Sequence, residues 1–145
     1  MMKIMPKEII VVLDSNELIF GLIGKEQYPK ILIGNLNKLK LNCSFRINRQ
    51  IVKEVLDNIP NYHHGKFFRL IDYGIIKYDS KIIDKNLLNK YSNLKLKKGD
   101  NVIAAYAESV KAKTLISENR HFLKELKTRK FKIVNAEQFL KDILK

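Results

Sequence analysis

Ile9-Ile10-Val11-Val12-Leu13, followed by Asp14-Ser15-Asn16, is the stretch that decides the fold of this chain. An unbroken aliphatic run with no alternating polar residues is typical of a strand covered on both faces, as in a parallel sheet. Asp14 ends the run, and the polar residues after it favour the start of a helix. A buried strand that leads directly into a helix predicts an α/β protein.

The rest of the chain alternates short apolar runs with segments of helical periodicity. Further strands are expected at residues 43–47, 75–78, 114–117 and 131–134. Further helices are expected at residues 28–41, 48–59, 66–72, 82–94, 100–110, 120–127 and 136–144. We also expect Gly21 and Gly24 to interrupt the first helix, Asn48 to cap the helix that follows it, and residues 60–65 to form a loop. This alternation predicts a doubly wound α/β fold with a mostly parallel sheet.

Length and composition indicate one globular domain over residues 1–145. A chain of this length buries enough surface to fold without a metal or disulfide staple. Hydrophobic residues make up 46% of the chain and charged residues 30%, which argues against disorder. Cys43 is the only cysteine, so an internal disulfide and a multi-cysteine zinc site are both excluded.

No stretch of the sequence is typical of export or of membrane insertion. The apolar run that ends at Asp14 is shorter than the roughly 7 to 15 residues of a signal-peptide core. No segment approaches the roughly 18 uninterrupted apolar residues of a membrane helix. We therefore expect a soluble, cytoplasmic protein that has no membrane partner.

The chain is strongly basic. It has 28 Lys and Arg against 15 Asp and Glu, a formal net charge of +13, and the lysines are spread along the sequence. A basic domain attracts polyanions through counterion release and long-range steering, which favours nucleic acid as a partner. The alternative is a lysine-rich surface that serves only solubility.

Polar residues stand where two expected strands end. Asp14 follows the first strand, and Ser117-Glu118-Asn119 lies at the end of the strand at 114–117. Ligands of open α/β sheets bind at the carboxyl ends of strands where the strand order reverses. Glu54 and Asp100, each on a helix, can add carboxylates to the same crevice. Taken singly, Asp14 and Asp100 can be helix caps and Glu54 a solvated residue, so only the joint arrangement points to catalysis.

At these residues the chain resembles the PIN-domain nucleases, which include the ribonuclease toxins of toxin–antitoxin pairs. The resemblance covers nearly the whole chain and is carried by four segments in order. They are Ile10-Val11-Val12-Leu13-Asp14-Ser15-Asn16-Glu17-Leu18-Ile19, Ile51-Val52-Lys53-Glu54-Val55-Leu56, Gly99-Asp100-Asn101-Val102-Ile103-Ala104-Ala105-Tyr106-Ala107 and Leu115-Ile116-Ser117-Glu118-Asn119-Arg120-His121-Phe122. The resemblance implies a PIN-like three-layer α/β/α fold.

The resemblance also implies a site in which Asp14, Glu54 and Asp100 hold Mg²⁺ or Mn²⁺. Hard cations need oxygen ligands, and a bound metal activates water and steadies the leaving oxygen of a phosphodiester. In the family an Asp often occupies the position of Asn119, which here brings no charge. Glu118 is the alternative fourth group. Ser15 most resembles a hydroxyl that supports the carboxylate cluster.

These observations together lead to one functional hypothesis and one rival. The hypothesis is a metal-dependent endoribonuclease with Asp14, Glu54, Asp100 and Asn119 as its catalytic groups, and with Lys98 and Arg120 on the RNA backbone. If it is a toxin, its partner is a small antitoxin, and the family implies a homodimer. The rival is a non-catalytic RNA-binding or assembly module that keeps the fold with a weakened site.

Overall fold

The computed structural model describes residues 8–94 and 96–143. Within these ranges it describes every side chain except that of residue 125. Its sheet has five strands in the order β3-β2-β1-β4-β5, and every neighbouring pair is parallel. The strands are β1 Ile10–Leu13, β2 Ser44–Asn48, β3 Lys77–Asp79, β4 Thr114–Ile116 and β5 Lys132–Val134. The predicted α/β fold with a parallel sheet is confirmed, and the order of the strands reverses between β1 and β4.

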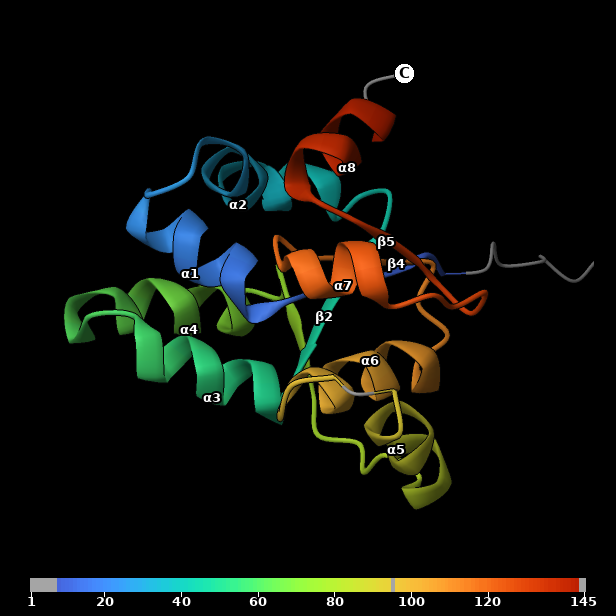
Figure 1. Ribbon diagram of the computed structural model, residues 1–145. Helices are drawn as coiled ribbons and strands as arrows, with labels where there is room; N and C mark the ends of the chain where they lie inside the picture. Colours follow the sequence, from blue (N-terminus) through green and yellow to red (C-terminus); the bar gives the residue numbers. More distant parts are fainter. Residues whose placement is uncertain (1–7, 95, 144–145) are drawn as a thin grey trace, which may run out of the picture.

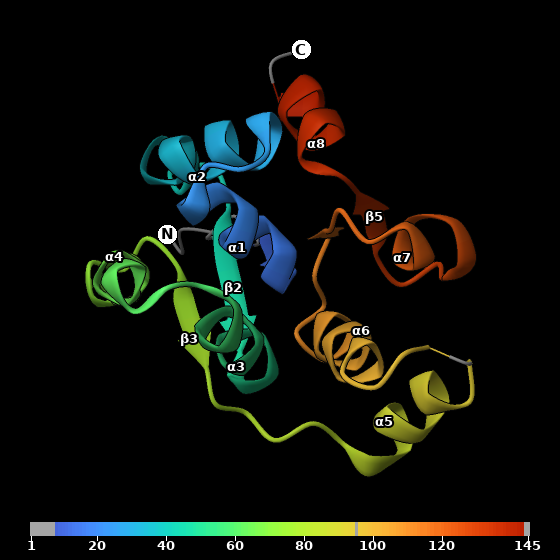
Figure 2. The ribbon, with the colours of Figure 1, turned by 60° about the vertical axis from the view of Figure 1, so that its left-hand side comes forward.

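Helices flank this sheet on both sides (Figure 1). They are α1 Ser15–Ile23, α2 Gln27–Leu39, α3 Arg49–Asn58, α4 His64–Asp72, α5 Lys85–Ser92, α6 Asp100–Ser109, α7 Arg120–Glu125 and α8 Ala136–Ile143, with a short 3-10 helix, η1, at Asn61–His63. Helices α1 to α4 lie on one side of the sheet and α5 to α7 on the other (Figure 2). Contacts between α1 and α2, between α1 and α3, and between α5 and α6 agree with this division, and α8 packs against α2.

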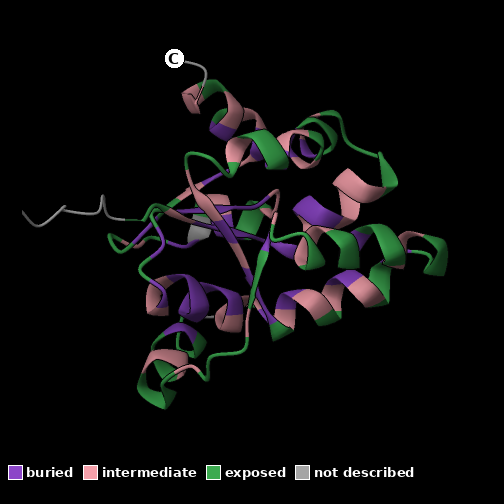
Figure 3. Ribbon diagram, turned by 180° about the vertical axis from the view of Figure 1, so that it is seen from behind, coloured by how far each residue is buried: buried purple, intermediate pink, exposed green. Residues whose placement is uncertain are grey.

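The hydrophobic core lies between the central strands and the inner faces of these helices (Figure 3). Val12, Leu13, Leu115 and Ile116 of β1 and β4 are fully buried. The alanines of α6 are also buried, and their small side chains allow this helix to lie close to the sheet. None of the helices in the described residues has the length and hydropathy that crossing a membrane requires.

Glycine and proline acted differently from the prediction at two places. Gly21 does not interrupt α1, which continues through it to Ile23. The position is a glycine because a Cβ there would collide with Ile33 and lie 2.8 Å from the carbonyl oxygen of Pro29, so its absence lets α1 pack closely against α2. Gly24, in the left-handed conformation, ends the helix. Residues 60–65 are not a loop, because η1 follows Pro60 and α4 then begins at His64 instead of at residue 66.

Three other boundaries also differ from the prediction. The third strand is displaced towards the C-terminus, because the amides of residues 75 and 76 both donate to the carbonyl of Leu70 in the turn after α4. Helix α5 begins only after Asp84, whose carboxylate caps the amide of Asn86, and Ile82 remains 91% exposed. At α6 Gly99 occupies the N-cap position and Asp100 is the first helical residue, so Asp100 is not the cap. Residue 144, included in the last predicted helix, lies outside the described part.

Candidate functional site

Asp14 lies at the carboxyl end of β1, at the point where the strand order reverses. Its amide donates to the carbonyl of Ile116 in β4 (2.9 Å), which anchors it between the two strands. Its carboxylate accepts from the Ser15 amide (2.7 Å) and from the Ser117 hydroxyl (2.6 Å). The side chain is buried, with 3% of its surface exposed. Burial, with smaller contributions from the charges of Asp100 and Glu54, raises the pKa of Asp14 to about 7 against the opposing effect of these hydrogen bonds.

Glu54 reaches the same crevice from the middle of α3. The Ser15 hydroxyl donates to its Oε1 (2.9 Å), and the Gln50 amide, one turn earlier on the same helix, donates to its Oε2 (2.8 Å). Ser15 also lies 3.4 Å from Asp14 Oδ1, so its hydroxyl stands between the two carboxylates. Ser15, for which a supporting role is predicted, thus contacts two of the three predicted metal ligands.

Asp100 opens α6, and Asn119 donates to its Oδ2 (3.1 Å) through the side-chain amide. Burial is the main cause that raises the pKa of Asp100, and the charge of Glu54 adds to it, while Asn119, Lys97 and His121 lower it. The oxygen of Asn119 caps α7 by accepting from the His121 amide (2.9 Å). The structure thus brings Asp14, Glu54 and Asp100 within electrostatic range of one another, with Asn119 against Asp100.

Glu118, the alternative to Asn119, faces the neighbouring helix. Its Oε2 accepts from the amide of Ala136 at the start of α8 (2.9 Å), and its own amide donates to the side chain of Asn16 (3.2 Å). The two candidates for the fourth position therefore have separate contacts. Of the predicted phosphate contacts, Lys98 and Arg120 are both exposed, with Arg120 at the first position of α7.

Sequence reasoning assigned no role to three residues of the site, although it placed Ser117 at the end of a strand. Ser117 binds Asp14, and only the pairing of β1 with β4 reveals that contact. Gln50 binds Glu54 and carried a usable signal, since residues four apart share one face of a helix. Gly99, with φ at +99°, lets the start of α6 approach α3, because a Cβ there would lie 2.9 Å from Gln50 Nε2 and 3.2 Å from Glu54 Oε2.

A fourth missed residue is Glu17, one turn after Asp14 on α1. Its side chain is completely buried, and neither carboxyl oxygen has a hydrogen-bond donor among the described residues. Burial, together with the neighbouring Glu118 carboxylate, raises the pKa of Glu17 to about 11. Glu17 is therefore a neutral acid at physiological pH, and its own proton can be donated to Glu118.

The donor set of the crevice suits a hard divalent cation, because it consists of carboxylate and amide oxygens. Within residues 8–94 and 96–143, however, no three or more His, Cys, Asp or Glu side chains are grouped closely enough to hold a metal ion. Mg²⁺ typically uses only one or two carboxylates and keeps several waters. The oxygen ligands of the crevice therefore fit such an ion, with water molecules completing its coordination.

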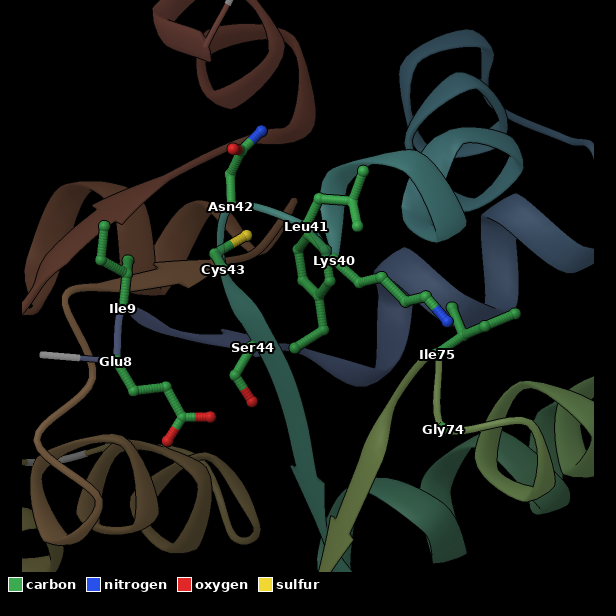
Figure 4. Close-up of a pocket in the computed structure, with 10 residues that line it drawn as sticks. Glu8, Ile9, Lys40, Leu41, Asn42, Cys43, Ser44, Gly74 and Ile75 are labelled. Atoms are coloured by element: carbon green, nitrogen blue, oxygen red, sulfur yellow. The ribbon is translucent and has the colours of Figure 1, made fainter. Parts of the chain in front are cut away.

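The opposite edge of the sheet is chemically different. A cavity of about 430 Å³ opens there, beside residues that precede β1, β2 and β3, including Ile9, Asn42 and Ile75 (Figure 4). Cys43 lies in its wall, and burial raises the pKa of this thiol to about 11, so it is not a thiolate at neutral pH. None of the acids of the crevice lines this cavity.

Comparison with known proteins adds support for the fold. No protein-family model matches the chain, and no curated protein matches it either. Among solved structures, the crystal structure of VapBC2 from Rickettsia felis, bound to a DNA fragment from their promoter, is similar to this chain with a TM-score of 0.62 and 16% sequence identity. The similarity covers 88% of this chain and 98% of that one, and it shows that this chain has a PIN-like α/β fold.

Proposed function

We propose that the protein is a Mg²⁺- or Mn²⁺-dependent endoribonuclease, the cytoplasmic toxin of a toxin–antitoxin pair. The observation that carries the proposal is the crevice at the β1–β4 reversal, where Asp14, Glu54 and Asp100 influence one another electrostatically. Ligand sites of open α/β sheets occur at this position. The PIN-like fold supports a nuclease, and the net charge of +13 supports a polyanionic substrate.

Asp14, Glu54 and Asp100 are the residues that would hold the cation, with the oxygen of Asn119 beside them. When bound, the cation supplies an activated water and neutralises charge on the phosphate. Mutual repulsion is one cause of the raised pKa values of Asp14 and Asp100, and a positive ion between the carboxylates relieves it. The ionised forms of these carboxyl groups are thus less stable without the cation and would be more stable with it.

The chain itself orients each of these carboxylates. Ser117 and the Ser15 amide hold Asp14, the Ser15 hydroxyl and Gln50 hold Glu54, and Asn119 holds Asp100. Exposed Lys98 and Arg120 contact the phosphate backbone of the RNA and position it without reading its sequence.

The proposal includes two protein partners. VapBC2, the similar structure, is a toxin–antitoxin complex, which supports a small antitoxin as one partner of this chain. A second copy of the chain is the other, in a homodimer of two such domains. Mass measurement of the purified chain, alone and co-expressed with the product of the adjacent gene, tests both.

The experiment that tests the activity is Asp100→Asn. We expect RNA cleavage in Mn²⁺ to fall at least about a hundredfold, since one positioned charge at the metal is lost. Without metal the variant should melt at a higher temperature than the parent, because two carboxylates about 4 Å apart repel by up to roughly 4 kcal/mol at an effective dielectric of 20. Added Mn²⁺ should stabilise it less than the parent.

The matched control is Asp72→Asn, which makes the same chemical change at an exposed position at the end of α4. It should leave cleavage and the effect of Mn²⁺ unchanged. If Asp100→Asn cleaves RNA normally and responds to Mn²⁺ as the parent does, the proposed site is wrong.

A non-catalytic RNA-binding or assembly module remains the second candidate. The neutral Asn119 favours it, as does the lack of a close group of three metal-binding side chains in the described residues. That candidate requires RNA binding without metal-dependent cleavage, so the cleavage assay separates the two.

A further inference from the structure

A groove of about 450 Å³ opens next to the acid crevice, at the carboxyl ends of β2 and β3. Its walls come from the start of α3, from the segment that joins β3 to α5, and from α5 and α6. Asn48 and Asp79, the last residues of the two strands, lie in its wall. Pockets of roughly 300 to 1,000 Å³ are typical of small-ligand sites, so one or two nucleotides fit here.

Gln50 joins this groove to the acid crevice. Its side chain lines the groove, and its amide donates to Glu54 Oε2 at 2.8 Å. Whatever occupies the groove therefore lies one side chain away from a proposed catalytic carboxylate.

The groove carries a net positive charge. Arg49, Lys53 and Lys81 line it, all three are exposed, and none forms an ion pair within the described residues. Asp79 is the acid in the wall, but its carboxylate lies 3.9 Å from the guanidinium of Arg46 and accepts from the Tyr106 hydroxyl at 3.3 Å. The three cations are thus free to bind a polyanion.

An aromatic ring and an apolar floor lie among these cations. Tyr78 lines the groove and is 40% exposed, and Ile83, Leu88 and Val102 supply apolar surface. Grooves that bind single-stranded nucleic acid combine backbone-binding cations with aromatic rings on which bases stack. This groove offers both groups within one ligand-sized space.

We propose that this groove binds the nucleotides of the RNA strand on one side of the phosphate that the acid crevice cleaves. Arg49, Lys53 and Lys81 bind the phosphates, and Tyr78 stacks on a base. The inference rests on the proposed function, because only a cleaved strand makes the groove a substrate subsite. A second copy of the chain is the other conceivable occupant, since Ile82 is 91% exposed at the rim. A two-fold interface would place the same basic patch of both copies together, so charge favours RNA.

The experiment compares two triple variants with the same loss of charge. The groove variant is Arg49→Ala, Lys53→Ala and Lys81→Ala. The control is Arg129→Ala, Lys40→Ala and Lys127→Ala, three exposed residues that precede β5 or β2 at the opposite edge of the sheet. Binding of a fluorescent single-stranded RNA of about 12 nucleotides is measured in EDTA at several salt concentrations, so that cleavage does not interfere.

We expect the groove variant to bind at least about tenfold more weakly. The slope of log affinity against log salt should become shallower by about 2, because each lost phosphate contact removes about 0.7 in single strands. The control variant should stay close to the parent. Tyr78→Ala should weaken binding, and Tyr78→Phe should retain it, because stacking needs the ring and not the hydroxyl.

Equal losses in both triple variants would overturn the inference, because net charge alone would then explain binding. A groove variant that binds RNA normally but changes the sedimentation mass would overturn it in favour of a second copy. Failure of the proposed function looks different. The parent would not cleave RNA in Mn²⁺, while the groove variant would still lose binding, which supports the groove as an RNA site and removes only the chemistry.

Discussion

Asp14 and Glu17 stand one turn apart at the start of α1, and both are buried acids at the same edge of the sheet. Asp14 receives hydrogen bonds from Ser15 and Ser117, and its pKa is about 7. Glu17 has no donor within the described residues, faces the acceptor Glu118, and has a pKa of about 11. Two carboxyl groups with similar burial thus differ in ionisation at neutral pH, where Asp14 is about half ionised and Glu17 is almost wholly protonated.

The difference shows that the placement of hydrogen-bond donors, and not burial alone, determines how readily each acid ionises. Donors around Asp14 support its ionised form, which a cation can then use. The neighbouring Glu118 carboxylate helps to raise the pKa of Glu17, and the same carboxylate accepts a hydrogen bond from the Ala136 amide at the start of α8. We call Asp14 with Glu54, Asp100 and Asn119 the first cluster, and Glu17 with Glu118 the second cluster. The first cluster has the properties of a binding site, and the second has those of a structural support.

Gly99→Ala should displace residues of the first cluster and leave the second cluster unchanged. A residue with a Cβ at φ +99° is strained and meets Gln50 and Glu54, so we expect a loss of about 2 to 3 kcal/mol in the free energy of unfolding. Cleavage should fall at least about tenfold as Glu54 is displaced.

Gly34→Ala is the control, because nothing lies within 4 Å of a Cβ there, in the middle of α2. It should stabilise the protein by about 0.5 to 1 kcal/mol. Equal effects of the two changes would contradict the role of Gly99.

Glu17→Gln removes the titrating carboxyl group of the second cluster and should therefore change how the stability of the protein depends on pH. The folded pKa of about 11 lies far above the ordinary Glu pKa of 4.5, so the stability that Glu17 contributes is complete below pH 4.5 and is lost as the pH rises towards 11. The slope of this loss is at most about 1.4 kcal/mol per pH unit. Between pH 7 and 9, above the pKa of Asp14, the parent should lose stability and the Gln variant should lose much less.

From pH 7 to pH 9 the difference in the free energy of unfolding between Glu17→Gln and the parent, measured with urea, should move in favour of the variant by up to about 2.8 kcal/mol, since two pH units contribute about 1.4 kcal/mol each. Glu17→Ala also lacks the titrating carboxyl group, so it should show the same flatter pH profile but lower stability at every pH, because it leaves a cavity. Parallel pH profiles for the parent and the Gln variant would mean that Glu17 is ionised in the folded protein.

Mn²⁺ affinity should depend on pH through Asp14. Below its raised pKa of about 7, a proton on Asp14 competes with the cation, so binding should release protons and strengthen up to tenfold per pH unit as the pH rises to that value. Calorimetry in two buffers with different ionisation enthalpies measures the released protons. Asp14→Asn should abolish the release, and an unchanged value would mean that Asp14 does not bind the ion.

Glu118→Ala and Asn119→Ala should separate neighbouring residues that belong to the two clusters. Removal of the Glu118 cap from α8 should cost about 1 kcal/mol of stability and leave cleavage nearly unchanged. Asn119→Ala should lower cleavage by a larger factor, because Asp100 loses its hydrogen bond. The reverse result, with Glu118→Ala the more damaging to cleavage, would identify Glu118 as the fourth group.

The strands other than β3 and several helix starts were predictable from local chemistry, but the position of β3 and the starts of α4 and α5 were not. The aliphatic run before Asp14 predicted β1, and Asn48 caps α3 with its side chain as expected. Contacts across the fold were not predictable in this way. The roles of Gly99, Gln50 and Ser117 depend on which elements are neighbours, and Glu17 looked like an ordinary polar residue at a helix start. Gly21 was misinterpreted for the same reason, since only the position of α2 explains it.

The place of β1 at the centre of the sheet also bears on how the protein folds. β1 pairs with β2, which follows soon after it in the chain, and with β4, whose residues Thr114–Ile116 come about a hundred positions later. Pairings this distant in sequence close large loops and form slowly. During synthesis, one edge of β1 therefore stays unpaired until residues 114–116 have emerged. The hydrogen bond from Ser117 to Asp14 forms only at that step, so the crevice is assembled late and is missing from any nascent chain that ends earlier.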